Sequence, residues 1–218
     1  MTPFEPIADA RPDDQPWPAM AWPLEPGVRL RGSTVELTLF EAERDGEGLY
    51  AAVDHDADWA YVAGRPPDAA SYAATLAAAA SQGRHPWVLR LVRPLAGLAS
   101  GTVIGTSSYL DVSVIDARLE IGSTAYDPRV WATAVNPEAK LLLLTHAFDV
   151  LGAGRVQLKT DVRNHRSQQA IARLGAHYEA TLRRYQRRSD ETVRDTVLFS
   201  ILAEEWPAVR DGLEARLA

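Results

Sequence analysis

The chain has 218 residues, 46% hydrophobic and 24% charged, which is the usual balance of a soluble globular protein with one substantial core. It contains no cysteine, which excludes disulfides, thiolate metal sites and a cysteine nucleophile. A net charge of −6 disfavours broad nucleic-acid binding, and no apolar run approaches the ~18 residues of a membrane span. These features favour a cytoplasmic protein without membrane or nucleic-acid partners.

The N-terminal segment is rich in proline, since half of the 14 prolines lie within residues 1–27. This composition predicts an extended arm rather than a folded unit, followed by a single domain over 28–218. Trp17 and Trp22 in the arm suit an apolar contact. The arm either packs on its own domain or reaches a second subunit, so a homodimer stays open.

The next segment predicts a strand and two helices. Residues 28–39 predict the first strand, because apolar residues alternate with polar ones. Residues 41–53 predict a short helix that Gly46 and Gly48 interrupt. Asp68 is expected to cap an alanine-rich helix over about 69–81.

Three aspartates and two aromatic residues lie between these predicted helices: Asp54, Asp56, Asp58, Trp59 and Tyr61. Carboxylates beside aromatic rings suit a substrate that carries an amine. The competing interpretation is a solvated acidic surface, which is the commoner role of any single acidic residue.

The middle and the end of the chain predict further strands. Residues 87–92 and 102–110 predict a hairpin across the turn 94–101, and residues 118–125 predict a fourth strand. A second hairpin is predicted over 177–188 and 193–202, before a terminal helix over 204–217. The four arginines at 183, 184, 187 and 188 in its first strand are best interpreted as a solvated edge that prevents strand pairing.

The most informative stretch runs from Arg129 to Gly175 and predicts loop, helix, strand, turn and helix. Asn136 is expected to cap the first helix, with Pro137 at its first position and Gly152 at its end. Residues 155–161 alternate as a strand does, and Asn164 is expected to cap the second helix. This order predicts an α/β layer with a crossover.

The loop before the first of these helices has the properties of a possible anion site. Amides at a helix start are unpaired and carry partial positive charge. Ala132, Thr133 and Ala134 are small, so a ligand can approach the backbone closely. The alternative is an ordinary helix start that binds only water.

Three segments carry a resemblance to a known family. Residues 119–128 contain Leu-Glu-Ile-Gly and Tyr-Asp-Pro, residues 131–139 read Trp-Ala-Thr-Ala-Val-Asn-Pro-Glu-Ala, and residues 164–176 contain Asn-x-x-Ser and Leu-Gly-Ala. They resemble the central strand, the pyrophosphate loop and the Asn-x-x-Ser…Leu-Gly-Phe block of GNAT-fold N-acyltransferases of the ribosomal-protein-alanine acetyltransferase (RimJ/RimL-like) type. One subgroup has a Trp-Gly-Thr-Gly-Val-Asn-Pro loop, which this sequence resembles with both glycines changed to alanine.

The resemblance implies an α/β (α+β) GNAT fold. This fold has a mixed, mostly antiparallel sheet of about seven strands, flanked by helices, with a splayed central strand pair. The implied activity is transfer of an acetyl group from acetyl-CoA to a primary amine by direct attack in a ternary complex. The acceptor is a protein N-terminus or a small molecule, coenzyme A is the co-substrate, and no metal takes part.

The resemblance also implies site residues. The cofactor-binding candidates are Trp131, Ala132, Thr133, Ala134, Val135, Asn136, Asn164 and Ser167. Ser167 is the implied acid for the leaving thiolate, and Glu120 is the candidate general base, provided that burial raises its pKa. The competing roles are a plain helix cap for Asn164, an exposed first-turn residue for Ser167 and an ion-paired strand residue for Glu120.

The two alanines leave a second function open. A methyl group at either position can obstruct a diphosphate or disfavour a positive φ. The alternative is therefore a GNAT-fold protein that binds acyl-CoA or a partner without turnover. The five histidines show no metal-binding spacing.

Overall fold

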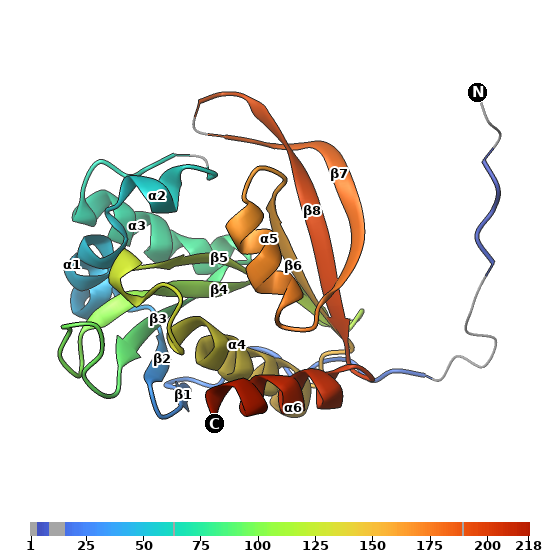
Figure 1. Ribbon diagram of the computed structural model, residues 1–218, viewed down its shortest axis with the longest axis horizontal. Coiled ribbons are helices and arrows are strands. Elements are labelled where there is room, and N and C mark those ends of the chain that lie inside the picture. The colour runs from blue at the N-terminus through green and yellow to red at the C-terminus, as the bar shows by residue number, and fades with distance from the viewer. Residues whose placement is uncertain (1–3, 9–15, 63, 189) are drawn as a thin grey trace.

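The computed structural model describes residues 4–8, 16–62, 64–188 and 190–218, whose strands form one mixed sheet with helices on both faces (Figure 1). The strands are β1 (Arg29–Arg31), β2 (Val35–Leu39), β3 (His85–Leu91), β4 (Val103–Ser113), β5 (Arg118–Tyr126), β6 (Arg155–Asp161), β7 (His177–Arg187) and β8 (Val193–Leu202). The helices are α1 (Ala42–Val53), α2 (Asp56–Trp59), α3 (Ala69–Ala79), α4 (Val135–Thr145), α5 (His165–Ala172) and α6 (Trp206–Leu217). Among the described residues, no helix is long and apolar enough to cross a membrane.

The strand order is β1-β2-β3-β4-β5-β6-β8-β7, and β5–β6 is its parallel pair. The crossover between these two strands contains α4, as predicted. They pair only from Arg118↔Arg155 to Glu120↔Gln157, although β5 continues to Tyr126 and β6 to Asp161. The two strands therefore diverge, and we call their unpaired parts, residues 121–126 and 158–161, the splay. The predicted mixed sheet with a splayed central pair is confirmed.

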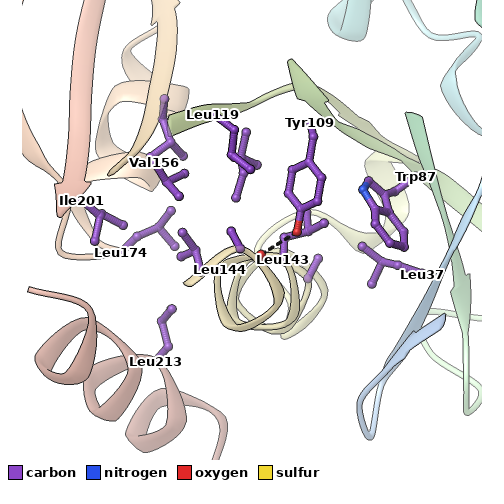
Figure 2. Close-up of a cluster of buried hydrophobic side chains, with 14 of the residues drawn as sticks. Leu37, Trp87, Tyr109, Leu119, Leu143, Leu144, Val156, Leu174, Ile201 and Leu213 are labelled. Atoms are coloured by element: carbon purple, nitrogen blue, oxygen red, sulfur yellow. Dashed lines mark hydrogen bonds between the residues drawn. The ribbon is translucent and has the colours of Figure 1, made fainter. Parts of the chain in front are cut away.

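The main core lies between the sheet and the helices α4 and α6 (Figure 2). Leu143 and Leu144 of α4 are fully buried against sheet residues that include Leu119 and Val156. The Tyr109 hydroxyl of β4 donates to the Leu143 carbonyl oxygen at 2.7 Å. A smaller core joins α1 and α3 to the opposite face. The two cores thus pack against opposite faces of the sheet that contains the splay.

The predicted strand over 28–39 is two strands, so the described sheet has eight strands rather than about seven. The break is a tight turn bound by Glu138 of α4. The Glu138 carboxylate accepts hydrogen bonds from the N–H groups of Ser33 at 2.9 Å, Thr34 at 2.7 Å and Val35 at 2.6 Å. A partner 103 residues away cannot be inferred from local periodicity.

Two helix predictions also need correction. Helix α1 is continuous across Gly46 and Gly48, so the predicted interruption is wrong. A Cβ atom at Gly46 would lie 2.9 Å from the Cβ atom of Ala73, so glycine permits the close approach of the two helices. The helix that ends at Gly152 is not uniformly α-helical, since residues His146–Val150 form a π-helical segment.

Residues 16–27 of the N-terminal arm contact the domain, whereas residues 4–8 are exposed. Met20 and Leu24 are buried in the main core, and the Trp22 ring packs edge-on against His85 at 4.9 Å between centroids. The Trp17 indole N–H donates to the Gly152 carbonyl oxygen at 3.4 Å. The remaining arm prediction, for residues 1–3 and 9–15, lies outside the described residues.

Candidate functional site

The loop before α4 has a tight turn that begins the helix earlier than predicted. The N-cap residue is Ala134, so the prediction that Asn136 caps this helix is wrong, and Asn136 and Pro137 lie inside its first turn. The Thr133 hydroxyl holds the loop, because it donates to the Val130 carbonyl at 2.6 Å and accepts from the Val135 N–H at 3.3 Å. A side chain that bonds across the turn, rather than a cap at 136, thus starts α4.

Ala132 adopts a φ of +58°, in the left-handed region that favours glycine. The methyl group at 132 therefore does not prevent a glycine-like turn, although it makes this turn strained. Ala134 has an ordinary helical φ of −65°. Of the two alanines, only Ala132 thus imposes a backbone penalty.

Several backbone donors before α4 lack protein partners. The first N–H of this region to bond back into the helix is that of Glu138, which donates to the Ala134 carbonyl at 3.0 Å. Within the described residues, the N–H groups of Ala132, Ala134 and Asn136 have no hydrogen-bond acceptor. The Glu138 carboxylate is directed to the β1–β2 turn instead. This helix start can therefore accept an anion such as a diphosphate.

Trp131 and Arg166 connect this loop to the start of α5. The Trp131 indole N–H donates to the Tyr126 carbonyl oxygen at 2.9 Å, which fixes the ring beside the end of β5. The Arg166 guanidinium carbon lies 3.5 Å from the centroid of the Trp131 ring, a cation–π contact. An exposed guanidinium at this position is a suitable partner for a phosphate group.

Asn164 caps α5, as predicted, because its Oδ1 atom accepts the Ser167 N–H at 3.0 Å. Its Nδ2 group donates to none of the described residues. Beside it lies a pocket of about 360 Å³, lined by residues 163–166 and by Ala57, Ala60 and Tyr61. The cap therefore occupies only the Asn164 oxygen and leaves its amide nitrogen available to a ligand.

Glu120 lies at the closed end of the splay and is ion-paired. Its carboxylate is 2.7 Å from the Lys159 ammonium, and Gln157 Nε2 donates to it at 3.4 Å. Burial raises the pKa of the Glu120 carboxyl, and the hydrogen bond from Lys159 opposes this rise. The ion-paired alternative thus describes the geometry, with a lysine in place of the expected arginine.

Asp58 of α2 is a second carboxylate near the splay. It lies by Tyr126 at the end of β5, whereas Glu120 lies at the closed end of the splay. Its Oδ2 atom is buried and has no partner among the described residues. Burial raises the pKa of Asp58 to about 6, while the charges of His55 and Arg166 and the Tyr126 N–H oppose this rise. Only a weak signal in the sequence pointed to this residue, because it is one of three neighbouring aspartates. No group of three or more acidic or histidine side chains in the described part of the chain could hold a metal ion.

Comparison with known proteins identifies the family. The model of the family described as "Acetyltransferase (GNAT) domain" matches residues 35–177. No curated protein matches the chain. A T. thermophilus protein of known structure, described as a predicted acetyltransferase, is 34% identical to this chain with a TM-score of 0.78. The match covers 91% of this chain and 100% of that one. A GCN5-related N-acetyltransferase from Brucella melitensis is 26% identical with a TM-score of 0.82, covering 93% and 90%.

A third structural neighbour is Mycobacterium smegmatis RimJ in complex with CoA-disulfide. It is 21% identical with a TM-score of 0.70, over 87% of this chain and 93% of that one, so it supports the fold alone. The family model covers well over half of the chain, and eight strands with a splayed pair agree with it. The chain therefore belongs to the GNAT acetyltransferases, a family of acyltransferases that use acetyl-CoA.

Proposed function

We propose that the protein transfers an acetyl group from acetyl-CoA to a primary amine by direct attack in a ternary complex. One observation carries the proposal: β5 and β6 stop pairing after Glu120↔Gln157, beside a helix start with unbonded amides. An extended pantetheine arm fits such a splay, where unpaired strand edges offer hydrogen bonds. The amine nitrogen then bonds to the thioester carbon, and the C–S bond breaks to release coenzyme A.

The cofactor is held from two sides in this proposal. The unbonded amides of Ala132, Ala134 and Asn136 bind the diphosphate, and Arg166 leaves the Trp131 ring to pair with a phosphate oxygen. Asn164 Nδ2 donates to the pantetheine, and the half-buried Ser167 hydroxyl donates to the leaving thiolate. These contacts fix the thioester in the splay before the amine arrives.

Two carboxylates, Glu120 and Asp58, are candidates for the general base. Glu120 was the expected base, but its pairing with Lys159 weakens it as a proton acceptor. Asp58 has a pKa of about 6 and an oxygen without a partner among the described residues, which suits proton removal near neutral pH. We therefore assign removal of the amine proton to Asp58 and retain Glu120 as the competing candidate.

The acceptor enters from the pocket of about 360 Å³ beside α2 and α5. This volume accommodates a small amine or the terminal residue of a peptide. The resemblance to ribosomal-protein-alanine acetyltransferases favours a protein N-terminus. A cytoplasmic location, a homodimer and the division at residue 27 are further proposals, which fractionation, light scattering and limited proteolysis would test.

A second function, cofactor binding without turnover, is supported by the strained Ala132 and by the Arg166–Trp131 contact across the proposed cofactor path. Isothermal titration calorimetry with acetyl-CoA separates binding from no binding. A free-thiol release assay with a panel of amines and N-terminal peptides then separates turnover from binding alone. Saturable thiol release that depends on the amine supports the transferase, whereas tight binding without release supports the second function.

A further inference from the structure

Lys140 is an unusual residue of α4, one turn beyond the start of the helix. Its side chain is 5% exposed, and its Nζ atom donates to the Thr124 hydroxyl at 2.8 Å and to the Ser107 hydroxyl at 3.1 Å. No carboxylate in the described ranges forms an ion pair with it. A buried ammonium group without a counter-ion is costly, so a fold that retains one calls for an explanation.

The two hydroxyls that contact Lys140 differ in their surroundings. Ser107 of β4 is fully buried, whereas Thr124 lies in the splay of β5 and is exposed. The hydroxyl oxygens of Ser107 and Thr124 are 2.8 Å apart, so the three polar atoms form a closed triangle. Only the Thr124 corner of this triangle reaches the splay.

The hydrogen positions follow from the available donors and acceptors. An ammonium group only donates, so Lys140 donates to both oxygens. Among the described residues, the Ser107 proton has one acceptor within reach, Thr124 Oγ1, and leaving a buried hydroxyl unbonded is costly. Both acceptor positions of Thr124 Oγ1 are then occupied. Its own proton must therefore point away from the triangle, toward the exposed side of the splay.

We propose that Thr124 donates this proton in a hydrogen bond to the carbonyl oxygen of the acetyl-CoA thioester, and that Lys140 positions and polarises the hydroxyl from behind. The inference rests on the proposed function, which places the thioester in the splay. As the amine nitrogen bonds to the carbonyl carbon, the C=O electron pair moves to oxygen, and it returns when the C–S bond breaks. The Thr124 proton stays on Thr124 and stabilises the oxyanion. Thr124 is thus a catalytic residue and Lys140 a positioning residue.

The charge of Lys140 adds a pH dependence. Burial lowers the pKa of Lys140 to about 7. The groups that face its Nζ atom are Ser107 of β4 and Thr124 of β5, which carry no charge, and Glu138 and His146 of the same helical segment are bonded elsewhere. The ammonium form predominates below pH 7 and is lost above it. Lys140 therefore polarises Thr124 more strongly at pH 6 than at pH 8. The preference for acetyl-CoA over coenzyme A should also be stronger at pH 6.

The first test is calorimetry with acetyl-CoA and with coenzyme A, because this comparison needs no acceptor. The wild type should prefer acetyl-CoA, and Thr124→Val should reduce this preference by about 3- to 10-fold, the usual effect of one lost hydrogen bond. Thr75→Val is the matched control, since it removes the exposed hydroxyl of a threonine in α3, outside the splay. An unchanged preference in Thr124→Val overturns the inference while leaving the proposed function intact. A wild type that binds neither ligand rejects both.

The second test separates positioning by Lys140 from a merely structural role. Lys140→Met should abolish the change in acetyl-CoA preference between pH 6 and pH 8, whereas Thr75→Val should retain it. Thermal unfolding serves as the structural readout, because replacing a buried charge with an apolar residue is often neutral or stabilising. A folded Lys140→Met variant with the wild-type pH dependence contradicts the assignment, and Thr124→Val keeps the hydroxyl testable if this variant does not fold.

Discussion

The two sides of the splay are built differently. On the side of α4, two buried charged residues, Glu138 and Lys140, bond to strands, and Thr133 fixes the loop. On the side of α2, a four-residue helix and the exposed residues Ala57, Ala60 and His165 surround a pocket. The proposed cofactor side is thus part of the folded core, whereas the proposed acceptor side is assembled from surface segments. This difference suggests a fixed donor site and a variable acceptor site.

The largest expected effect comes from disrupting the cofactor side at Glu138. Glu138→Gln replaces a carboxylate that accepts four hydrogen bonds from residues 33–35 with an amide that has one acceptor oxygen. Unpaired buried amides should lower the free energy of unfolding by about 3 kcal/mol. Urea denaturation measures this loss. Glu36→Gln is the control, because the side chain of Glu36 forms ion pairs with two exposed arginines, Arg29 and Arg31. A loss below about 1 kcal/mol would show that this turn does not depend on α4.

The next effect tests the acceptor side. Asp58→Asn should lower kcat by about 100-fold or more, because it removes the proposed base, while the affinity for acetyl-CoA stays constant. Glu120→Gln is the matched comparison, and a larger loss of kcat in this variant would transfer the role of base to Glu120. The thiol release assay supplies both numbers.

Asp58 also predicts a pH effect on stability. Its pKa rises from 3.8 to about 6 on folding, so the folded state binds the proton more tightly, and stability falls as pH rises through this range. Asp58→Asn should therefore raise the melting temperature at pH 8 and leave it unchanged near pH 3. Equal melting temperatures of the two proteins at pH 8 would show that Asp58 is well solvated.

A smaller effect separates the two roles of Asn164. Asn164→Asp keeps an oxygen that caps α5 but removes the amide donor, so cofactor affinity should fall by about 10-fold with little loss of stability. Asn164→Ala should lose both affinity and about 1 kcal/mol of stability. Calorimetry and urea denaturation measure the two quantities. Wild-type affinity in Asn164→Asp would leave Asn164 as a plain helix cap.

The smallest effect is expected at Arg166, which links the two sides of the splay. Arg166→Gln should weaken coenzyme A binding a few-fold and reduce the salt dependence of the affinity, because a charge pair with phosphate is lost. Titrations at two ionic strengths provide the measurement. Tighter binding by the variant would mean that the contact with Trp131 obstructs the cofactor.

The sequence predictions were accurate where local interactions determine the structure. Strands β6 and β8 agree with the predicted ranges 155–161 and 193–202, since local alternation determines them. Asn164 and Asp68 cap their helices because a cap is a local interaction. The break before β2 was not predictable, because it depends on the distant residue Glu138. The contact between Gly46 and Ala73 was not predictable either, because the two residues lie on different helices.

The candidate site was predictable only where a motif marks it. The loop 131–136 and Asn164 were identified by resemblance, but nothing in the sequence linked Lys140 with Thr124 or set Asp58 apart from its neighbouring aspartates. Charge state and partner choice depend on burial, which appears only after folding. The Glu120–Lys159 ion pair has the same origin, since these residues become neighbours only when β5 and β6 lie side by side.

The most direct test of the account is a crystal structure after soaking with coenzyme A. We expect the diphosphate to contact the amides of Ala132, Ala134 and Asn136 and the pantetheine to lie between β5 and β6, with Arg166 displaced from Trp131. Coenzyme A bound elsewhere, or an empty splay at saturating concentration, would contradict the proposed cofactor site.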